Sequence, residues 1–250
     1  MNLAYGFVVA VGSFTLLVLG FILLASFLDE ALTFSLRQYK EAFVSNSDFW
    51  FYFWNSCGLS IPIMLGVVCV GTLGGYSFAK YRFRGDKLWL ALYILFMMIP
   101  FQVMLAPQYR LVYSIGLKKS ELSVILPNAF SSFGAFMIYQ YALQIEDSTL
   151  EAARIDGAGE WRIFCSIALP QLKNGIAALM LLSLIDTWNL IEQPLVFLEE
   201  EYRYPLSVAL RMGTEGNFAG CVVFLIPLFL VFLLGKDMLI DGIGKSVVKA

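Results

Sequence analysis

The stretch from Glu151 to Pro170 combines residue types and spacings that suit docking to another protein. It follows the pattern Glu-Ala-Ala-x-x-x-Gly, then nine residues, then Ile-x-Leu-Pro. Asp147 or Ser148 is suited to cap a helix just before it, and Glu151 stands at the third position after Ser148, as a capping box requires. The pattern therefore predicts a short helix that begins near Asp147 and presents a carboxylate on its first turns.

The glycine of this pattern predicts where the helix ends. Gly157 follows Asp156 and can adopt the left-handed conformation that closes a helix. A second helix should then turn three apolar side chains toward the core, Trp161, Phe164 and Ile167. We expect two short helices at a sharp angle over 147–170, which form a knob that a partner can grip. The alternative is an amphipathic surface hairpin with no partner.

A second polar group lies inside an apolar block further along the chain. Asp186 and Glu192 are carboxylates there, and charges at membrane depth usually face a bundle interior or an aqueous cavity. Asn189 and Gln193 follow Asp186 by three and seven positions, so in a continuous helix the three share one face. This predicts a polar strip on a solute path or at a seam between two membrane subunits. Alternatively, the helix breaks near Trp188 and Glu192 reaches the outer interface.

The composition identifies the class of protein in which these residues sit. Of the 250 residues, 59% are hydrophobic and 14% are charged, whereas soluble domains carry about 25% charged residues. The sequence has no histidine, and its four cysteines form no C-x-x-C pair. We therefore expect an integral membrane protein without a metal site.

Six apolar blocks approach or exceed the roughly 20 residues that cross a bilayer as a helix. They are uninterrupted rather than alternating, which favours helices over barrel strands. The sequence thus predicts an all-α integral membrane protein, a single transmembrane domain over 1–250, with the knob between the fourth and fifth spans. The blocks cover about 3–27, 51–78, 88–105, 125–143, 176–198 and 218–234.

Basic residues in the short loops give the orientation. The densest cluster, Lys80 to Lys87, follows the second span and favours a cytoplasmic position for that loop. Both termini and the knob are then cytoplasmic as well, with only a weak overall excess of Lys and Arg on that side.

The segment Gly242–Ser246 ends like a phosphate-binding loop, but Leu239 stands where that motif needs its first glycine. We therefore expect no nucleotide site and no enzymatic activity in this chain.

Motifs along most of the chain, from about Phe51 onward, resemble one family of membrane proteins. The chain is similar to the MalG-like permease subunits of binding-protein-dependent carbohydrate ABC importers, the EAA-loop family. The matching segments are Asn55-Ser56, Phe78 to Gly85, Met98 to Pro100, Gly116-Leu117, Leu126-Pro127, Glu151 to Ala158, Trp188-Asn189 and Pro194-Leu195. The segment 186–193 is more acidic than is usual in that family, which bears on whether the solute is a simple neutral sugar.

The resemblance implies a function and a set of partners. The chain would form half of the path for a sugar or sugar-like solute in a bacterial-type inner membrane. Its partners would be a second homologous permease, two ATPase subunits that hold ATP and Mg²⁺, and an extracytoplasmic solute-binding protein. The chain itself would hold no cofactor.

The resemblance also assigns residues to roles. The residues that couple to the ATPases would be Glu151, Ala152, Ala153, Asp156, Gly157 and Ala158. The candidates for the solute path are Asp186, Trp188, Asn189, Gln193 and Asn55. Two alternatives stay open, which are a scaffold subunit that translocates nothing and an importer of a solute that is not a sugar.

Overall fold

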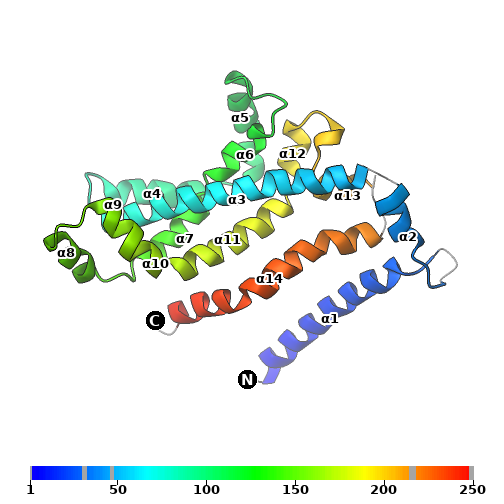
Figure 1. The fold of residues 1–250 in the computed structure, drawn as a ribbon, viewed down its shortest axis with the longest axis horizontal. Coiled ribbons are helices and arrows are strands. Elements are labelled where there is room, and N and C mark those ends of the chain that lie inside the picture. The colour runs from blue at the N-terminus through cyan, green and yellow to red at the C-terminus, as the bar shows by residue number, and fades with distance from the viewer. Residues whose placement is uncertain (1, 30–32, 46–47, 214–217, 248–250) are drawn as a thin grey trace.

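The computed structural model describes residues 2–29, 33–45, 48–213 and 218–247, and its regular structure there is helical apart from one isolated bridge between Leu28 and Phe34. Figure 1 shows an elongated bundle with α8 at one end and α2 and α13 at the other. The longer helices are α1 (Asn2–Ser26), α3 (Asp48–Lys80), α4 (Asp86–Met97), α5 (Phe101–Ser114), α6 (Leu122–Ala129), α7 (Ser132–Ala142), α8 (Asp147–Ile155), α11 (Lys173–Trp188) and α14 (Phe218–Val247). The shorter ones are α2 (Arg37–Lys40), α9 (Glu160–Ile163), α10 (Leu169–Gln171), α12 (Glu192–Phe197) and α13 (Leu206–Met212).

Helix α3 is the axis of the bundle. Its 33 residues extend about 50 Å, which exceeds the roughly 30 Å hydrocarbon thickness of a bilayer. It packs on α6, α7 and α11. Gly71 and Gly75 let α7 approach closely, because a Cβ on Gly75 would lie 2.5 Å from the carbonyl oxygen of Ala135. Small residues spaced in this way commonly mark close helix contacts in membranes.

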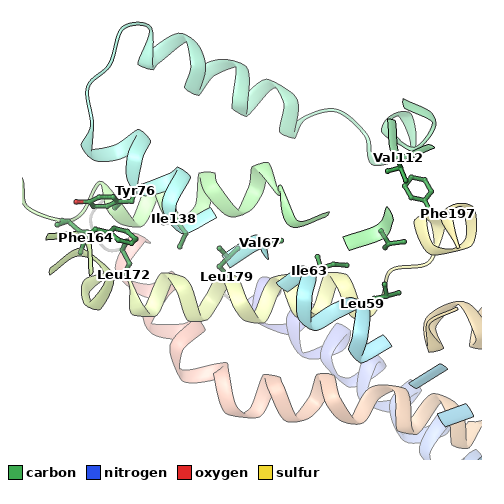
Figure 2. Close-up of a cluster of buried hydrophobic side chains, with 14 of the residues drawn as sticks. Leu59, Ile63, Val67, Tyr76, Val112, Ile138, Phe164, Leu172, Leu179 and Phe197 are labelled. Atoms are coloured by element: carbon green, nitrogen blue, oxygen red, sulfur yellow. The ribbon is translucent and has the colours of Figure 1, made fainter. Parts of the chain in front are cut away.

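The apolar core follows this axis. Figure 2 shows Leu59, Ile63 and Val67 of α3 beside Leu179 of α11. The same cluster continues to Tyr76 near the α8 end, and a separate part joins α5 to α12. The core therefore ties both ends of the bundle to one long helix.

Four segments are long and apolar enough to cross a membrane, and six qualify if each of two bent pairs counts as one span. The four are Tyr5–Ser26, Asp48–Lys80, Leu122–Ala142 and Phe218–Lys236. They match four of the six blocks expected from the sequence.

The span expected at about 88–105 contains a sharp bend. Helices α4 and α5 meet at an angle of 103° around a break that includes Pro100. Proline disfavours helical backbone in the residue before it, so α4 ends at Met97 and α5 begins at Phe101.

The helix expected over about 176–198 is interrupted as well. Helix α11 ends at Trp188, and α12 begins only at Glu192. Pro194 accounts for the break, because its ring would clash with the carbonyl of Leu190 in a continuous helix. Asp186, Asn189 and Gln193 therefore do not share one helical face, and the alternative of a break near Trp188 is correct.

Candidate functional site

The knob at 147–170 lies at one end of the bundle (Figure 1) and turns at Gly157. Gly157 has φ +82°. Its N–H donates to the Arg154 carbonyl at 3.0 Å, and the Ala158 N–H donates to the Ala153 carbonyl at 3.0 Å. These two bonds form a Schellman motif, which ends α8 and satisfies its last carbonyls. The sequence pattern located this turn correctly.

The start of α8 differs from the sequence prediction. Glu146 takes the N-cap position, and α8 has no side-chain cap bond there. Ser148 lies one residue inside the helix, so the expected capping box with Glu151 does not form in the described structure.

Two adjacent residues at the end of α3 hold the two helices of the knob. Lys80 Nζ donates to Asp147 Oδ1 at 2.7 Å, at the start of α8. Tyr81 Oη donates to Glu160 Oε2 at 2.8 Å, at the start of α9. Arg154 of α8 binds both oxygens of Glu160, at 2.7 and 3.2 Å. The end of the longest helix is thus fastened to both halves of the knob.

These contacts shift the ionisation of the groups involved. The Arg154 guanidinium, with help from the Tyr81 hydroxyl, lowers the pKa of Glu160. Lys80 lowers the pKa of Asp147 in the same way. Burial, and then the bond to Glu160, raises the pKa of Tyr81 from 10.0 to about 12. At neutral pH the two carboxyls are therefore charged and the phenol keeps the proton that it donates.

The outer face of the knob is exposed. Glu151 and Ala152 are exposed, and Ile155 is 86% exposed. Asp156 and Gly157 are exposed too, whereas Ala153 and Ala158 pack on the core. An exposed carboxylate beside an exposed large apolar side chain suits a protein partner with a basic, partly apolar groove.

Two of the three apolar residues expected to turn inward do so. Phe164 is buried and Ile167 is partly buried. Trp161 is 69% exposed, so the expectation for its side chain is wrong. The α-helical turn Glu160–Ile163 instead directs Ile163 into the core, where it is fully buried.

A polar recess of about 120 Å³ lies between α3, the α6–α7 segment and α11. Asp186 lines it, although Asp186 is itself exposed. On α11 it is joined by Ser183 and Thr187, which the spacing of a helix places on the same face. The other polar lining residues are Asn128 and Ser131.

The other residues expected on a solute path have structural contacts instead. Trp188 is 4% exposed, and its Nε1 donates to the Phe224 carbonyl at 3.1 Å. Gln193 is fully buried and bonds to Asn128 and Gln108. Asn55 Nδ2 donates to the carbonyls of Tyr202 and Tyr204.

Asn189 is exposed and donates to the Ile185 carbonyl at the end of α11. The structure does not bring it or the other three, Trp188, Gln193 and Asn55, into the recess with Asp186.

Ion pairs join two loops at the end opposite the knob. Glu199 lies 3.2 Å from Lys118 and 3.3 Å from Lys119. Arg203 donates to the Lys119 carbonyl at 2.6 Å and pairs with Glu200 at 3.0 Å. The acidic segment 199–201 is therefore partly neutralised by the loop between α5 and α6.

Sequence reasoning did not single out several residues of these sites. Arg154 and Glu160 carried a usable signal, because opposite charges lay on either side of a predicted turn. Ser183 and Thr187 carried another, since polar residues flank Asp186 at helical spacing. The contribution of Asn128 had no local signal, because its place in the recess depends on tertiary packing.

Comparison with known proteins gives a family match. The family model described as "Binding-protein-dependent transport system inner membrane component" matches residues 71–245. The chain is 30% identical over 224 residues to the arabinooligosaccharides transport system permease protein AraQ of Halalkalibacterium halodurans, covering 87% of this chain and 80% of that protein. It is 29% identical over 201 residues to the sn-glycerol-3-phosphate transport system permease protein UgpE of Yersinia pestis bv. Antiqua, covering 77% and 72%.

A solved structure shares the fold. A chain of a bacterial ABC transporter involved in the import of the acidic polysaccharide alginate superposes with a TM-score of 0.78. The match covers 93% of this chain and 95% of that one, at 22% identity.

Proposed function

Because the chain belongs to the family of binding-protein-dependent transport system inner membrane components, we propose that it forms half of a solute path and is driven through its knob by separate ATPases. It is a multi-pass inner-membrane permease subunit of an importer. The six transmembrane spans, the 1–250 single domain and the cytoplasmic position of the knob and both termini are parts of this proposal.

The observation that carries the proposal is the exposed tip of the knob. Ile155 and Glu151 face outward on α8, while Lys80 and Tyr81 fasten the same unit to α3. A force on the knob is therefore transmitted to the helix that packs on α6, α7 and α11. Coupling requires only that contacts at the knob differ in free energy between two states of the bundle.

The partners follow from this arrangement. An ATPase would bind Glu151, Ala152, Ala153, Asp156, Gly157 and Ala158, and ATP with Mg²⁺ would lie in two such subunits. A second permease would complete the path. The extracytoplasmic binding protein would deliver the solute at the opposite end, near the loops that Glu199 and Lys118 join.

The solute that we propose is a carbohydrate or a sugar-like compound. The names of similar proteins mention arabinooligosaccharides, sn-glycerol-3-phosphate and alginate. Asp186 is the residue that we assign to the path, because it lines a polar recess between α3, the α6–α7 segment and α11. Trp188, Gln193 and Asn55 are not part of this assignment, because their polar groups bond within the protein.

Reconstitution of the whole complex tests the proposal. The permease pair, the ATPases and the binding protein are placed in proteoliposomes, and both ATP hydrolysis and uptake are measured with and without loaded binding protein. A path-forming permease gives uptake and faster hydrolysis with the loaded protein. A scaffold subunit that only docks ATPases gives a complex whose hydrolysis ignores the solute, and this result would reject the proposal.

A further inference from the structure

The polar recess beside Asp186 presents mainly hydrogen-bond acceptors. Asp186 is exposed, and an ionised carboxylate can only accept. Ser183 Oγ donates to the Met180 carbonyl at 3.1 Å, and Thr187 Oγ1 donates to the Ser183 carbonyl at 2.8 Å. Each hydroxyl has one hydrogen, so both have already used theirs on the backbone and offer lone pairs to a ligand.

The side chain of Asn128 likewise has its hydrogen-bond donors occupied within the protein. Its Nδ2 donates to the Val124 carbonyl at 2.7 Å and also to Gln193 Oε1, which uses both amide hydrogens. Gln193 Nε2 in turn donates to Gln108 Oε1 at 3.3 Å. This chain of bonds fixes the orientation of the amides and leaves the Asn128 carbonyl oxygen as the group available to a ligand.

Ser131 provides a hydrogen-bond donor to the recess. Its Oγ accepts the Gly134 N–H at 3.2 Å, so its own hydrogen is available for donation. Among the described residues that line the recess there is no Lys or Arg. The lining therefore combines one negative charge, several acceptors and one neutral donor.

We propose that this recess binds an uncharged, hydroxyl-bearing part of a carbohydrate and rejects carboxylate and phosphate groups. Sugar hydroxyls would donate to Asp186, Asn128, Ser183 and Thr187, and one would accept from Ser131. A carboxylate or phosphate brings mainly acceptors and a like charge, and such juxtapositions are strongly unfavourable. An ammonium group would match the acceptors but could not use the Ser131 donor.

The size of the recess limits what it holds. About 120 Å³ is below the roughly 300–1,000 Å³ of pockets that enclose a whole ligand. The recess is therefore one wall of a path, and the rest of the solute would lie against the second permease. The inference rests on the proposed function, because it requires the recess to open on the solute path.

The test uses two matched probes in the reconstituted complex. Arabinotriose is compared with the aldonate made by oxidising its reducing end, each at a concentration that saturates the binding protein as measured by calorimetry. Uptake is measured for the wild type, for Asp186→Asn, and for Glu121→Gln as a control that removes one exposed carboxylate outside the recess. We expect the wild type and Glu121→Gln to prefer arabinotriose by about tenfold or more. Asp186→Asn should raise the ratio of aldonate uptake to arabinotriose uptake several-fold.

The outcomes distinguish the inference about the recess from the proposed function of the chain. Uptake of arabinotriose with an unchanged preference in Asp186→Asn overturns the inference and leaves the proposed function standing. A wild type that takes up the aldonate as fast as arabinotriose overturns the inference too. Absence of any uptake, together with hydrolysis that ignores the loaded binding protein, overturns the proposed function itself.

Discussion

The Lys80 ammonium at the end of α3 lies 2.7 Å from the carboxylate of Asp147 at the start of α8. The Lys80 side chain is only 4% exposed, whereas Asp147 is 77% exposed. Lys80 also donates to the Ile145 carbonyl at 2.5 Å. The pair therefore joins a membrane helix to the knob by a contact that is buried on one side.

This contact predicts which residue holds the first turn of α8. Asp147→Ala should lower the local stability of α8 by about 1 kcal/mol, since Asp147 is largely exposed and such pairs contribute modestly. Ser148→Ala should change it by less than about 0.5 kcal/mol, because Ser148 does not cap the helix. Hydrogen exchange of residues 147–155 in the purified complex measures both. A larger effect from Ser148→Ala would restore the capping box that the sequence suggested.

Gly157 should be intolerant of substitution, for reasons of backbone conformation. At φ +82° an alanine costs roughly 1–2 kcal/mol, and a proline is incompatible because its φ is locked near −65°. Gly157→Pro should abolish uptake with the membrane helices intact, as checked by circular dichroism and complex assembly. Gly159→Ala is the matched control, since Gly159 has φ −69° and open space around its Cα. Equal transport by both variants would contradict the role of the turn.

The contacts of Tyr81 and Glu160 predict the pH range over which the knob is most stable. The pKa of Glu160 is lowered in the folded protein, so its stabilisation is present above its unfolded pKa and is lost as pH falls through the folded one. The pKa of Tyr81 is raised to about 12, so its contribution is complete below the unfolded value of about 10 and is lost as pH rises toward 12.

Hydrogen exchange corrected for the intrinsic rate at each pH checks this range. Protection of 147–163 should be flat between about pH 6 and 9 and should fall on both sides. Glu160→Gln should weaken the acid-side fall, and Tyr81→Phe should weaken the alkaline one. A loss of protection at alkaline pH that persists in Tyr81→Phe would show that another group controls the stability of the knob.

Several features of the fold and site could be read from the sequence because they depend on local chemistry. Gly157 is an example, since a left-handed helix end needs glycine whatever surrounds it. Uninterrupted apolar runs similarly located the spans around α3 and α14. Asp186 lines a recess with other polar residues and is itself exposed, so its separation from lipid stays a prediction.

Other features depend on tertiary packing or on competing local effects. Proline in a membrane helix is sometimes tolerated, so the breaks at Pro100 and Pro194 could not be distinguished from the unbroken passage at Pro62. Trp188 looked like a path residue, but packing against α14 buries it. The Asn128–Gln193 contact joins residues that are 65 positions apart, and no local pattern shows such a pair.

The orientation of the bundle predicts which loops a membrane-impermeant reagent can reach. On a background without the native cysteines, Gly159→Cys at the knob should be labelled only from the cytoplasmic side. Glu201→Cys, at the opposite end of the bundle, should be labelled from outside. Both sites lie in exposed segments, so poor access does not explain a negative result. Labelling of Gly159→Cys in intact cells would overturn the six-span arrangement.

The coupling of solute uptake to ATP hydrolysis through the knob is measured most directly with one charge reversal. Glu151→Lys is compared with the wild type and with Glu121→Lys, which makes the same change at an exposed residue away from the knob. Uptake and hydrolysis are followed in proteoliposomes with loaded binding protein. We predict that Glu151→Lys lowers uptake by about tenfold or more, within the usual range of coupling free energies, while Glu121→Lys stays near the wild type. Uptake by Glu151→Lys at the wild-type rate would contradict the coupling role of the knob.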